Sequence, residues 1–145
     1  ASLVFDRGRI RGCEAGHLSG ASAFYQIVES PAPGRFAFQS RAGVAAADAP
    51  TLDPFPLIME GIRRHDELTQ LRGIVPDGAR FAPTGAKPTP PDGEAADVAQ
   101  DVFRLVGGGA SAAECEAALP LDSYRVRRFI AHWVETKALR PAAAD

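Results

Sequence analysis

The sequence predicts an α+β fold, in which a small antiparallel sheet packed with helices is followed by a three-helix, winged-helix-like unit. Short apolar runs and a glycine-containing turn in the first forty residues favour strands. In the last third, beyond a proline-rich stretch, apolar residues recur at helical spacing. These observations place an α+β domain at 1–75, a proline-rich linker at 76–93 and a helical unit at 94–145.

The beginning of the chain indicates a β-hairpin. Leu3, Val4 and Phe5 form a short apolar strand. The Arg7-Gly8 pair after it suits a tight turn, since glycine accepts the positive φ angles that such turns need. A second strand should then run to about Ala15.

A helix and a third strand are expected next. The helix starts at Ser19 or Gly20, and prolines end it. Its apolar residues recur at i, i+3, i+4 and i+7: Ala21, Phe24, Tyr25 and Val28. The segment 35–39 alternates, with Phe36 and Phe38 on one face, and this pattern predicts a half-buried strand.

A longer helix at 53–72 follows an alanine-rich loop at 40–50. Asp53 can cap it, and Pro54 suits its first position. The helix has two apolar arcs with a polar face between them. One arc holds Phe55, Ile58, Met59 and Ile62, the other Leu57, Leu68 and Leu71, and the polar face Glu60, Arg63, Glu67 and Gln70. Two arcs need cover from two sides, so this helix should join the two halves of the chain.

The first core is expected between the sheet and these two helices. Phe5, Phe36 and Phe38 would give the sheet an apolar face, and the helix containing 21–28 would cover it. The long helix would close this core through one arc, namely with Phe55, Ile58 and Ile62.

The last half predicts a linker and three helices. Four prolines within 83–93 indicate a stiff, extended segment rather than a packed element. The helices are expected at 95–106, from Ser111, where Glu114 completes a capping box, and from Asp122 to about Lys137. The last helix has one apolar arc: Val126, Phe129, Ile130, Trp133 and Val134. A short strand at 139–141 would give a winged variant of the helix-turn-helix order.

The first part of the chain resembles the DUF4388, or PATAN, domain of bacterial signalling proteins. Four pieces carry the resemblance, in the family's order and at about its spacing: LVFDRGRIRGCEAG, GASAFYQIV, GRFAFQ and LIMEGIRRHDEL. They cover 3–71, roughly half of the chain. The resemblance implies a non-catalytic module, commonly found with response-regulator receiver domains and in motility and type IV pilus signalling. A degenerate winged-helix-like segment often follows that module, and 94–145 is similar to it.

One departure from the family gives a hypothesis. The family domain normally opens with a helix and a first strand before the piece that matches 3–5, whereas this sequence begins at that strand. Either the N-terminal part of the domain is missing from this sequence, or something else completes it. Our hypothesis is that a partner chain completes residues 3–5, by strand exchange or edge pairing. An unpaired edge strand is a template for such pairing. A monomer at high concentration would contradict this hypothesis.

No group of residues predicts catalysis, a metal or a cofactor. His65-Asp66 spells the dipeptide of metal-dependent phosphohydrolases, but the further ligands of such sites are missing from the pattern. Cys13 and Cys115 lie far apart and are expected to be reduced thiols of a cytoplasmic protein. Because no acid, base and oxyanion site come together, we do not expect an enzyme.

A winged-helix DNA-binding regulator is the alternative function. Arg125, Arg128 and His132 share the polar face of what would be the recognition helix. Against it, 94–145 has six Lys/Arg and eight Asp/Glu, and the whole chain has a net charge of −2. Such a balance gives no electrostatic footprint for nucleic acid.

The leading expectation is a cytoplasmic adaptor of bacterial signalling that binds another protein, such as a response regulator or a motility component. It would be a homo-oligomer or be completed by another chain. The expected contact residues are Leu3, Phe5, Glu60, Arg63, Glu67, Arg125 and Arg128. No apolar run approaches the roughly 18 residues that span a bilayer, so no membrane contact is expected.

Overall fold

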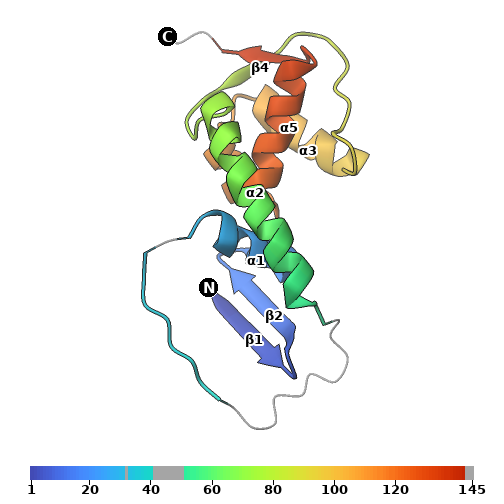
Figure 1. Ribbon diagram of the computed structural model, residues 1–145. Coiled ribbons are helices and arrows are strands. Elements are labelled where there is room, and N and C mark those ends of the chain that lie inside the picture. Colours follow the sequence, from blue (N-terminus) through green and yellow to red (C-terminus); the bar gives the residue numbers. More distant parts are fainter. Residues whose placement is uncertain (32, 41–50, 143–145) are drawn as a thin grey trace.

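The computed structural model describes residues 1–31, 33–40 and 51–142 (Figure 1). It confirms the predicted α+β class: a small antiparallel three-stranded sheet combined with five helices. The helices are α1 (Gly20–Glu29), α2 (Pro54–Ile74), α3 (Ala96–Gly107), α4 (Ala112–Ala118) and α5 (Ser123–Glu135). The strands are β1 (Ser2–Asp6), β2 (Arg9–Ala15), β3 (Leu18–Ser19), β4 (Phe81–Pro83) and β5 (Leu139–Pro141). The loop predicted at 40–50 lies outside the described residues except at its first position.

The predicted hairpin is present. β1 and β2 pair antiparallel, with Asp6 opposite Arg9 at the turn. Arg7 and Gly8 have φ angles of 49° and 77°. Positive values at both central positions are what a two-residue type I′ turn requires. β3, which the sequence analysis did not predict, pairs with the end of β2, so β2 is the central strand of the order β1-β2-β3.

The first core lies where α1 packs on β2 and β3, at the upper end of the sheet in the view of Figure 1. α1 follows the predicted stripe, since Phe24 is buried and Ala21, Tyr25 and Val28 are partly buried against the same core. The buried residues of this core are Ile10, Cys13, Leu18, Ala23, Phe24 and Leu57. Their number is small, and one of them comes from α2.

Three phenylalanines expected in this core are exposed instead. Residues 33–40 form no strand, and Phe36 and Phe38 are 97% and 84% exposed. An alternating pattern makes a strand only where a neighbouring strand supplies hydrogen bonds, and the described residues place none beside this segment. Phe5, which does lie in a strand, is 54% exposed because it lies beyond the area that α1 covers.

α2 runs through both halves of the molecule, as a joint should (Figure 1). The Asp53 side chain accepts a hydrogen bond from Phe55 N at 3.0 Å, and Pro54 is the first helical residue, as predicted. The prediction that the first arc closes the core is wrong. Phe55 is 70% exposed, and Ile58 and Ile62 are about half exposed.

The packing of α2 on α1 explains why the arc that was expected in the core faces outward. The buried residues of α2 are Leu57, Gly61 and Leu68, which share one face. A Cβ atom on Gly61 would lie only 2.9 Å from Val28 Cγ1, so α1 approaches α2 through this glycine. At 100° per residue, Phe55, Ile58, Met59 and Ile62 then lie on the opposite side and face outward.

The helical unit has a larger and more complete core. α3, α4 and α5 pack together, and the predicted caps are present: Ser111 and Glu114 form the capping box of α4, and Asp122 caps α5. The predicted terminal strand is β5, and it pairs antiparallel with β4. The buried side chains of this core include Val75, Phe81, Val102, Val106, Leu121, Val126, Phe129, Ile130, Trp133 and Leu139.

The stretch predicted to be an unpacked linker lies against this core. β4 is one strand of the two-stranded sheet, and Trp133 Nε1 donates a hydrogen bond to Thr89 O at 2.7 Å. Pro91 is buried. Proline favours an extended chain but does not prevent it from packing, and here the carbonyl groups remain free to accept hydrogen bonds. The position of a boundary between the two units stays a prediction.

Candidate functional site

The first candidate surface is the outer edge of β1. β1 is an edge strand of its sheet, and within the described ranges no other strand pairs with its outer side. It contains neither proline nor lysine, which are common protections of an edge. Its one carboxylate, Asp6, lies at the end and pairs with Arg11 at 2.9 Å. β1 therefore has the properties of an edge open to a further strand.

The register of the hairpin shows where the apolar side chains of β1 point. Leu3 lies opposite Cys13, and Phe5 lies opposite Ile10. Residues directly opposite each other in an antiparallel pair share a face of the sheet. Ile10 and Cys13 are buried, whereas Leu3 is 37% exposed. Leu3 and Phe5 therefore extend the core face of the sheet beyond the cover that α1 provides.

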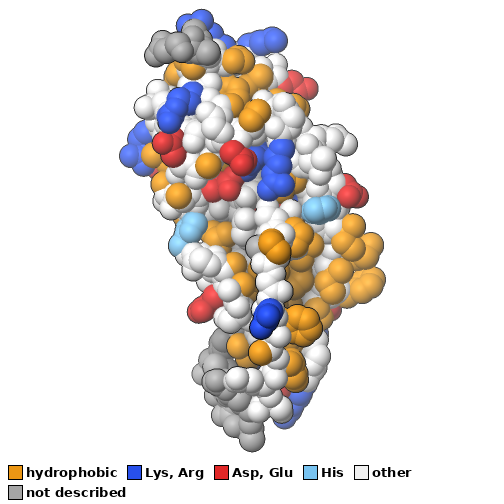
Figure 2. All heavy atoms as spheres, turned by 90° about the vertical axis from the view of Figure 1, so that its left-hand side faces the viewer, with side chains coloured by type: hydrophobic (Ala, Val, Ile, Leu, Met, Phe, Trp, Pro, Cys, Tyr) orange, Lys and Arg blue, Asp and Glu red, His pale blue; other side chains and the backbone are white. Residues whose placement is uncertain are grey.

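The second candidate surface is the outward side of α2, which we call the α2 apolar face. Its members are Phe55, Ile58, Met59 and Ile62, all exposed large hydrophobic residues. Figure 2 shows hydrophobic side chains gathered along one flank of the molecule, at the height of the N-terminal half of α2. Large exposed apolar areas of this kind mark interaction sites more often than single exposed residues do.

Backbone pairing brings the two surfaces to the same end of the sheet. Ile10 exchanges hydrogen bonds with Leu52 at 3.0 Å and 2.9 Å, on the side of β2 away from β1. Phe5, Ile10 and Leu52 thus form one row across the sheet. α2 begins two residues after Leu52, so the start of the α2 apolar face lies near the end of β1.

The polar face of α2 is partly exposed to solvent and partly in contact with α5. Arg63 pairs with Glu60 at 2.7 Å and also with Glu67. The Tyr124 hydroxyl donates to Glu67 Oε2 at 2.6 Å. The Arg63 hydrogen bond holds the pKa of Glu60 down, to about 2, despite partial burial. Glu60, Arg63 and Glu67 are therefore partly used in holding α2 to α5, and their role in binding a partner stays a prediction.

The cations predicted on α5 lie against the chain's own 92–94 segment. Arg125 pairs with Glu94 at 2.5 Å. Arg128 lies 3.6 Å from the same carboxylate and donates to Asp92 O at 2.7 Å. Nε2 of His132 is buried without a hydrogen-bond partner among the described residues. The structure brings the three residues together, and both arginines share the single carboxylate of Glu94.

The N-terminus of α5 is where α1 meets the helical unit. Its first backbone amides find side-chain acceptors. Ser123 N donates to Gln26 Oε1 at 2.9 Å, and Tyr124 N donates to Glu29 Oε2 at 3.2 Å. The next amide donates to the cap residue Asp122 at 2.9 Å. Two residues of α1 therefore help to cap a helix of the other unit.

A buried ionic cluster completes this junction, and we call it the joint cluster. Arg64 of α2 lies 3.5 Å from Glu29, 3.4 Å from Asp122 and 2.8 Å from Glu60. The side chains of Glu29 and Asp122 are fully buried. The Arg64 guanidinium also stacks 3.9 Å from the centre of the Tyr25 ring.

Burial raises the pKa values of two carboxyl groups in the joint cluster. It raises the pKa of the Glu29 carboxyl to about 7, and the nearby Asp122 carboxylate adds to the rise. Burial also raises the pKa of Asp122, although the Arg125 amide and Arg64 act in the opposite direction. One guanidinium thus faces three carboxyl groups, two of them without access to water.

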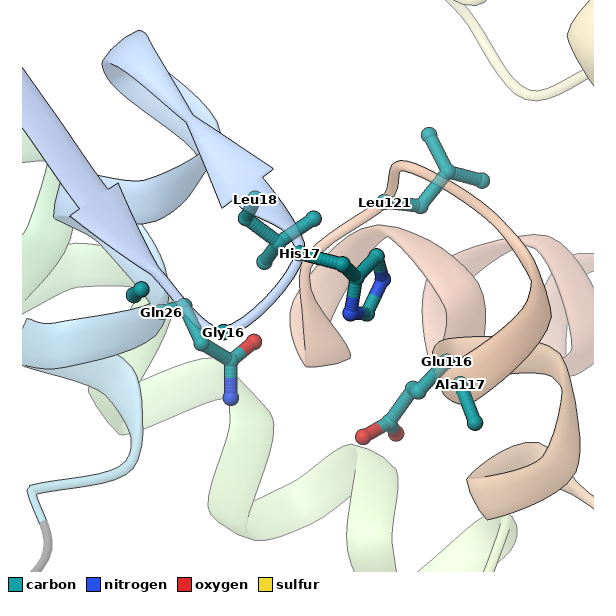
Figure 3. A pocket seen from close by; sticks show the side chains of 8 residues that line it. Gly16, His17, Leu18, Gln26, Glu116, Ala117 and Leu121 are labelled. Atoms are coloured by element: carbon teal, nitrogen blue, oxygen red, sulfur yellow. The ribbon is translucent and has the colours of Figure 1, made fainter.

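A hollow of about 340 Å³ lies beside the joint, between the β2–β3 turn and α4 (Figure 3). The side chains of His17, Gln26 and Glu116 enter it from the two units. All three have structural partners: His17 Nε2 lies 2.8 Å from Leu119 O, while Gln26 and Glu116 both contact Ser123. The hollow is part of the contact between the units, and its polar groups form no nucleophile-and-base arrangement.

Sequence reasoning missed Glu29, and it did not predict that Arg64 and Asp122 meet it in a buried cluster or that Arg127 is a buried cation. Arg127 is almost fully buried, where it pairs with Asp77 and Glu116. A signal for such residues existed in the helical spacing. Glu29 follows Tyr25 by four positions and Arg127 precedes Ile130 by three, so both border apolar stripes. Charged residues at such borders are candidates for buried ion pairs.

The structure offers no metal centre within the residues it describes, where no group of three or more His, Cys, Asp or Glu could hold an ion. Both cysteines are free and buried. Burial raises the pKa of the Cys115 thiol to about 11, so it is not a thiolate near neutral pH. His65, singled out in the sequence, places Nδ1 3.1 Å from Glu29 O. None of the described helices has the length and apolarity needed to cross a membrane.

Comparisons with known proteins gave no match: no family model, no curated protein and no solved structure matches this chain. The resemblance to the DUF4388 domain therefore stays a prediction, carried by the four sequence pieces quoted above.

Proposed function

We propose that this chain is a non-catalytic adaptor module that binds another protein by adding a strand at β1. One observation carries the proposal. Leu3 and Phe5 lie on the core face of the sheet, at an edge that no described strand pairs and beyond the cover of α1. A strand added there would gain backbone hydrogen bonds and would bury both side chains.

The occupant is an extended segment of another polypeptide, and a second copy of this chain can supply one. In an antiparallel β1–β1 pair centred on Val4, Leu3 faces Phe5 of the other copy and Ser2 faces Asp6. In this register no two residues of like charge lie opposite each other. Such a pair would destabilise the sheet. Self-association is therefore the form of the proposal that can be tested with the chain alone.

The biological setting of the proposal rests on the family resemblance. It places the adaptor in the cytoplasm of a bacterium, in a pathway with a response regulator or in motility and type IV pilus regulation. The geometry of β1 supports protein binding but does not select among these partners.

The DNA-binding alternative has less support. A recognition helix needs uncompensated cations on a free face. Here Arg125 and Arg128 face Glu94, and the first turn of α5 lies against α1. The net charge of −2 adds no attraction to phosphates.

Light scattering coupled to size exclusion, with and without duplex DNA at low salt, separates the two functions. We expect a dimer that ignores DNA, that becomes a monomer in the Leu3→Lys variant and that persists in the control Ile74→Lys, an exposed residue at the far end of α2. A monomer at high concentration would refute pairing at β1. A DNA-dependent shift that salt abolishes would instead favour the regulator, with Arg125, Arg128 and His132 as the contact residues.

A further inference from the structure

The contact between the two units depends on a charge arrangement that a single proton can change. Glu29 lies at the end of α1, and its two carboxylate oxygens have different surroundings. Oε2 accepts the Tyr124 amide hydrogen at 3.2 Å. Oε1 is buried without a hydrogen-bond partner among the described residues, and its nearest opposite charge is Arg64 at 3.5 Å.

Charged and titratable groups from four helices surround Glu29. α1 places Tyr25 over the Arg64 guanidinium, and α2 brings Arg64, Glu60 and, at the Glu29 carbonyl, His65. α5 brings Asp122 as its cap and Arg125 next to it, while Glu116 of α4 reaches the junction through Ser123. Arg64 faces three carboxylates, and because Glu60 also pairs with Arg63, it is the buried Glu29 and Asp122 that share the Arg64 charge. A buried site with this excess of negative charge is costly, and a proton on one carboxylate relieves the cost.

We propose that the junction of α1 with α5 is a proton-sensitive joint, which holds when Glu29 carries a proton and opens more readily when Glu29 is ionised. The inference concerns the contact between the units and is independent of whether β1 binds a partner. In the closed joint Glu29 is a neutral carboxylic acid, and Oε2 continues to accept from the Tyr124 amide.

The direction follows from the proton balance. Glu29 has a pKa of about 7 when enclosed, against 4.5 for an exposed glutamate. Between these values the closed joint binds the proton and the open one does not, so closure weakens as pH rises through this window. The equilibrium constant for opening should increase on the order of 50-fold from about pH 5 to about pH 8. Below about pH 4.5 both forms are protonated at Glu29, and the dependence ends.

Amide hydrogen exchange on the full chain tests the proposal. The amides of Ser123 and Tyr124 are capped by Gln26 and Glu29, so their exchange, corrected for intrinsic rates, reports opening of the joint. Amides in the middle of α5, beside Phe129, report global unfolding and serve as the internal reference. We expect the first pair to lose protection on the order of 50-fold from about pH 5 to about pH 8 relative to the reference.

Three variants make the test specific. Glu29→Gln keeps an acceptor for the Tyr124 amide but cannot ionise, so its protection should not vary with pH. Glu67→Gln removes a half-exposed carboxylate that also contacts Tyr124, and it should keep the wild-type dependence. His65→Gln removes the imidazole that contacts the Glu29 carbonyl, and it should also keep the wild-type dependence.

Three results would overturn the proposal. The first is a wild-type protection that stays constant between about pH 5 and pH 8. The second is a pH dependence that survives in Glu29→Gln. The third is a carbon NMR titration in which the Glu29 carboxyl has its midpoint near the ordinary value of a glutamate. The NMR titration needs no variant, so it remains decisive if Glu29→Gln fails to fold.

Discussion

The two units of this molecule differ in how completely they bury their apolar side chains. In the helical unit, Trp133, Phe129, Ile130 and Val126 are fully buried. In the sheet unit, β1 and the α2 apolar face leave Leu3, Phe5 and Phe55 exposed. Because an apolar side chain gains about 1.5–3 kcal/mol from full burial, the sheet unit forgoes stabilisation that a bound polypeptide could supply. Under the proposed function, the sheet unit is therefore the part that binds and the helical unit is its scaffold.

Truncating one aromatic side chain in each unit should give the largest difference between the units in the loss of unfolding free energy. Trp133→Ala should lower the free energy of unfolding by about 3–5 kcal/mol, because it leaves a cavity in the complete core. Phe38→Ala, at a side chain that is mostly exposed, should change it by less than about 0.5 kcal/mol. Urea unfolding measures both. Equal losses would mean that Phe38 is buried in solution and that the contrast between the units is wrong.

Two glycines of α2 test how tightly the sheet unit is attached to this helix. Gly61→Ala should destabilise the protein by about 1–3 kcal/mol, because the new Cβ meets the branched side chain of Val28. Gly73→Ala, where a Cβ meets nothing within 4 Å, should stabilise it by about 0.5–1 kcal/mol through helix propensity. Thermal unfolding distinguishes the signs. A stabilising Gly61→Ala would show that α1 does not approach α2 through this residue.

Replacing the N-cap serine of one helix in each unit should give the smallest difference in stability loss. Ser111 accepts the Glu114 amide hydrogen within a capping box, so Ser111→Ala should cost about 1 kcal/mol. Ser19 caps α1 without a side-chain hydrogen bond, so Ser19→Ala should cost less than about 0.5 kcal/mol. Urea midpoints of the two variants, compared at equal slope, check this order. A larger loss at Ser19 would contradict the cap geometry of α1.

Local signals made the helical unit predictable from the sequence. The capping box at Ser111, the cap at Asp122 and the arc of α5 are all short-range patterns, and all three are present in the structure. The Arg7-Gly8 turn was predictable for the same reason. Each of these features depends on residues within a few positions of one another.

The sheet unit was harder to predict because its outcome depends on contacts between distant residues. Phe36 and Phe38 alternate as in a strand, but no described strand lies beside them. The choice between the arcs of α2 was decided by Gly61 against Val28, which periodicity alone does not reveal. The joint cluster was missed because Glu29, Arg64 and Asp122 come from three separate helices. The open outer edge of β1, in contrast, was anticipated, although the exposure of Phe5 was not.

The central claim, that β1 takes a strand from another polypeptide, is tested most directly by hydrogen exchange of the β1 amides as a function of protein concentration, with light scattering in parallel. We predict that β1 gains protection as dimers form, while β5, which belongs to the helical unit, does not change. Leu3→Lys should abolish the gain, because it places a charge on the edge. Unchanged exchange of β1 in a protein that remains monomeric would contradict the account.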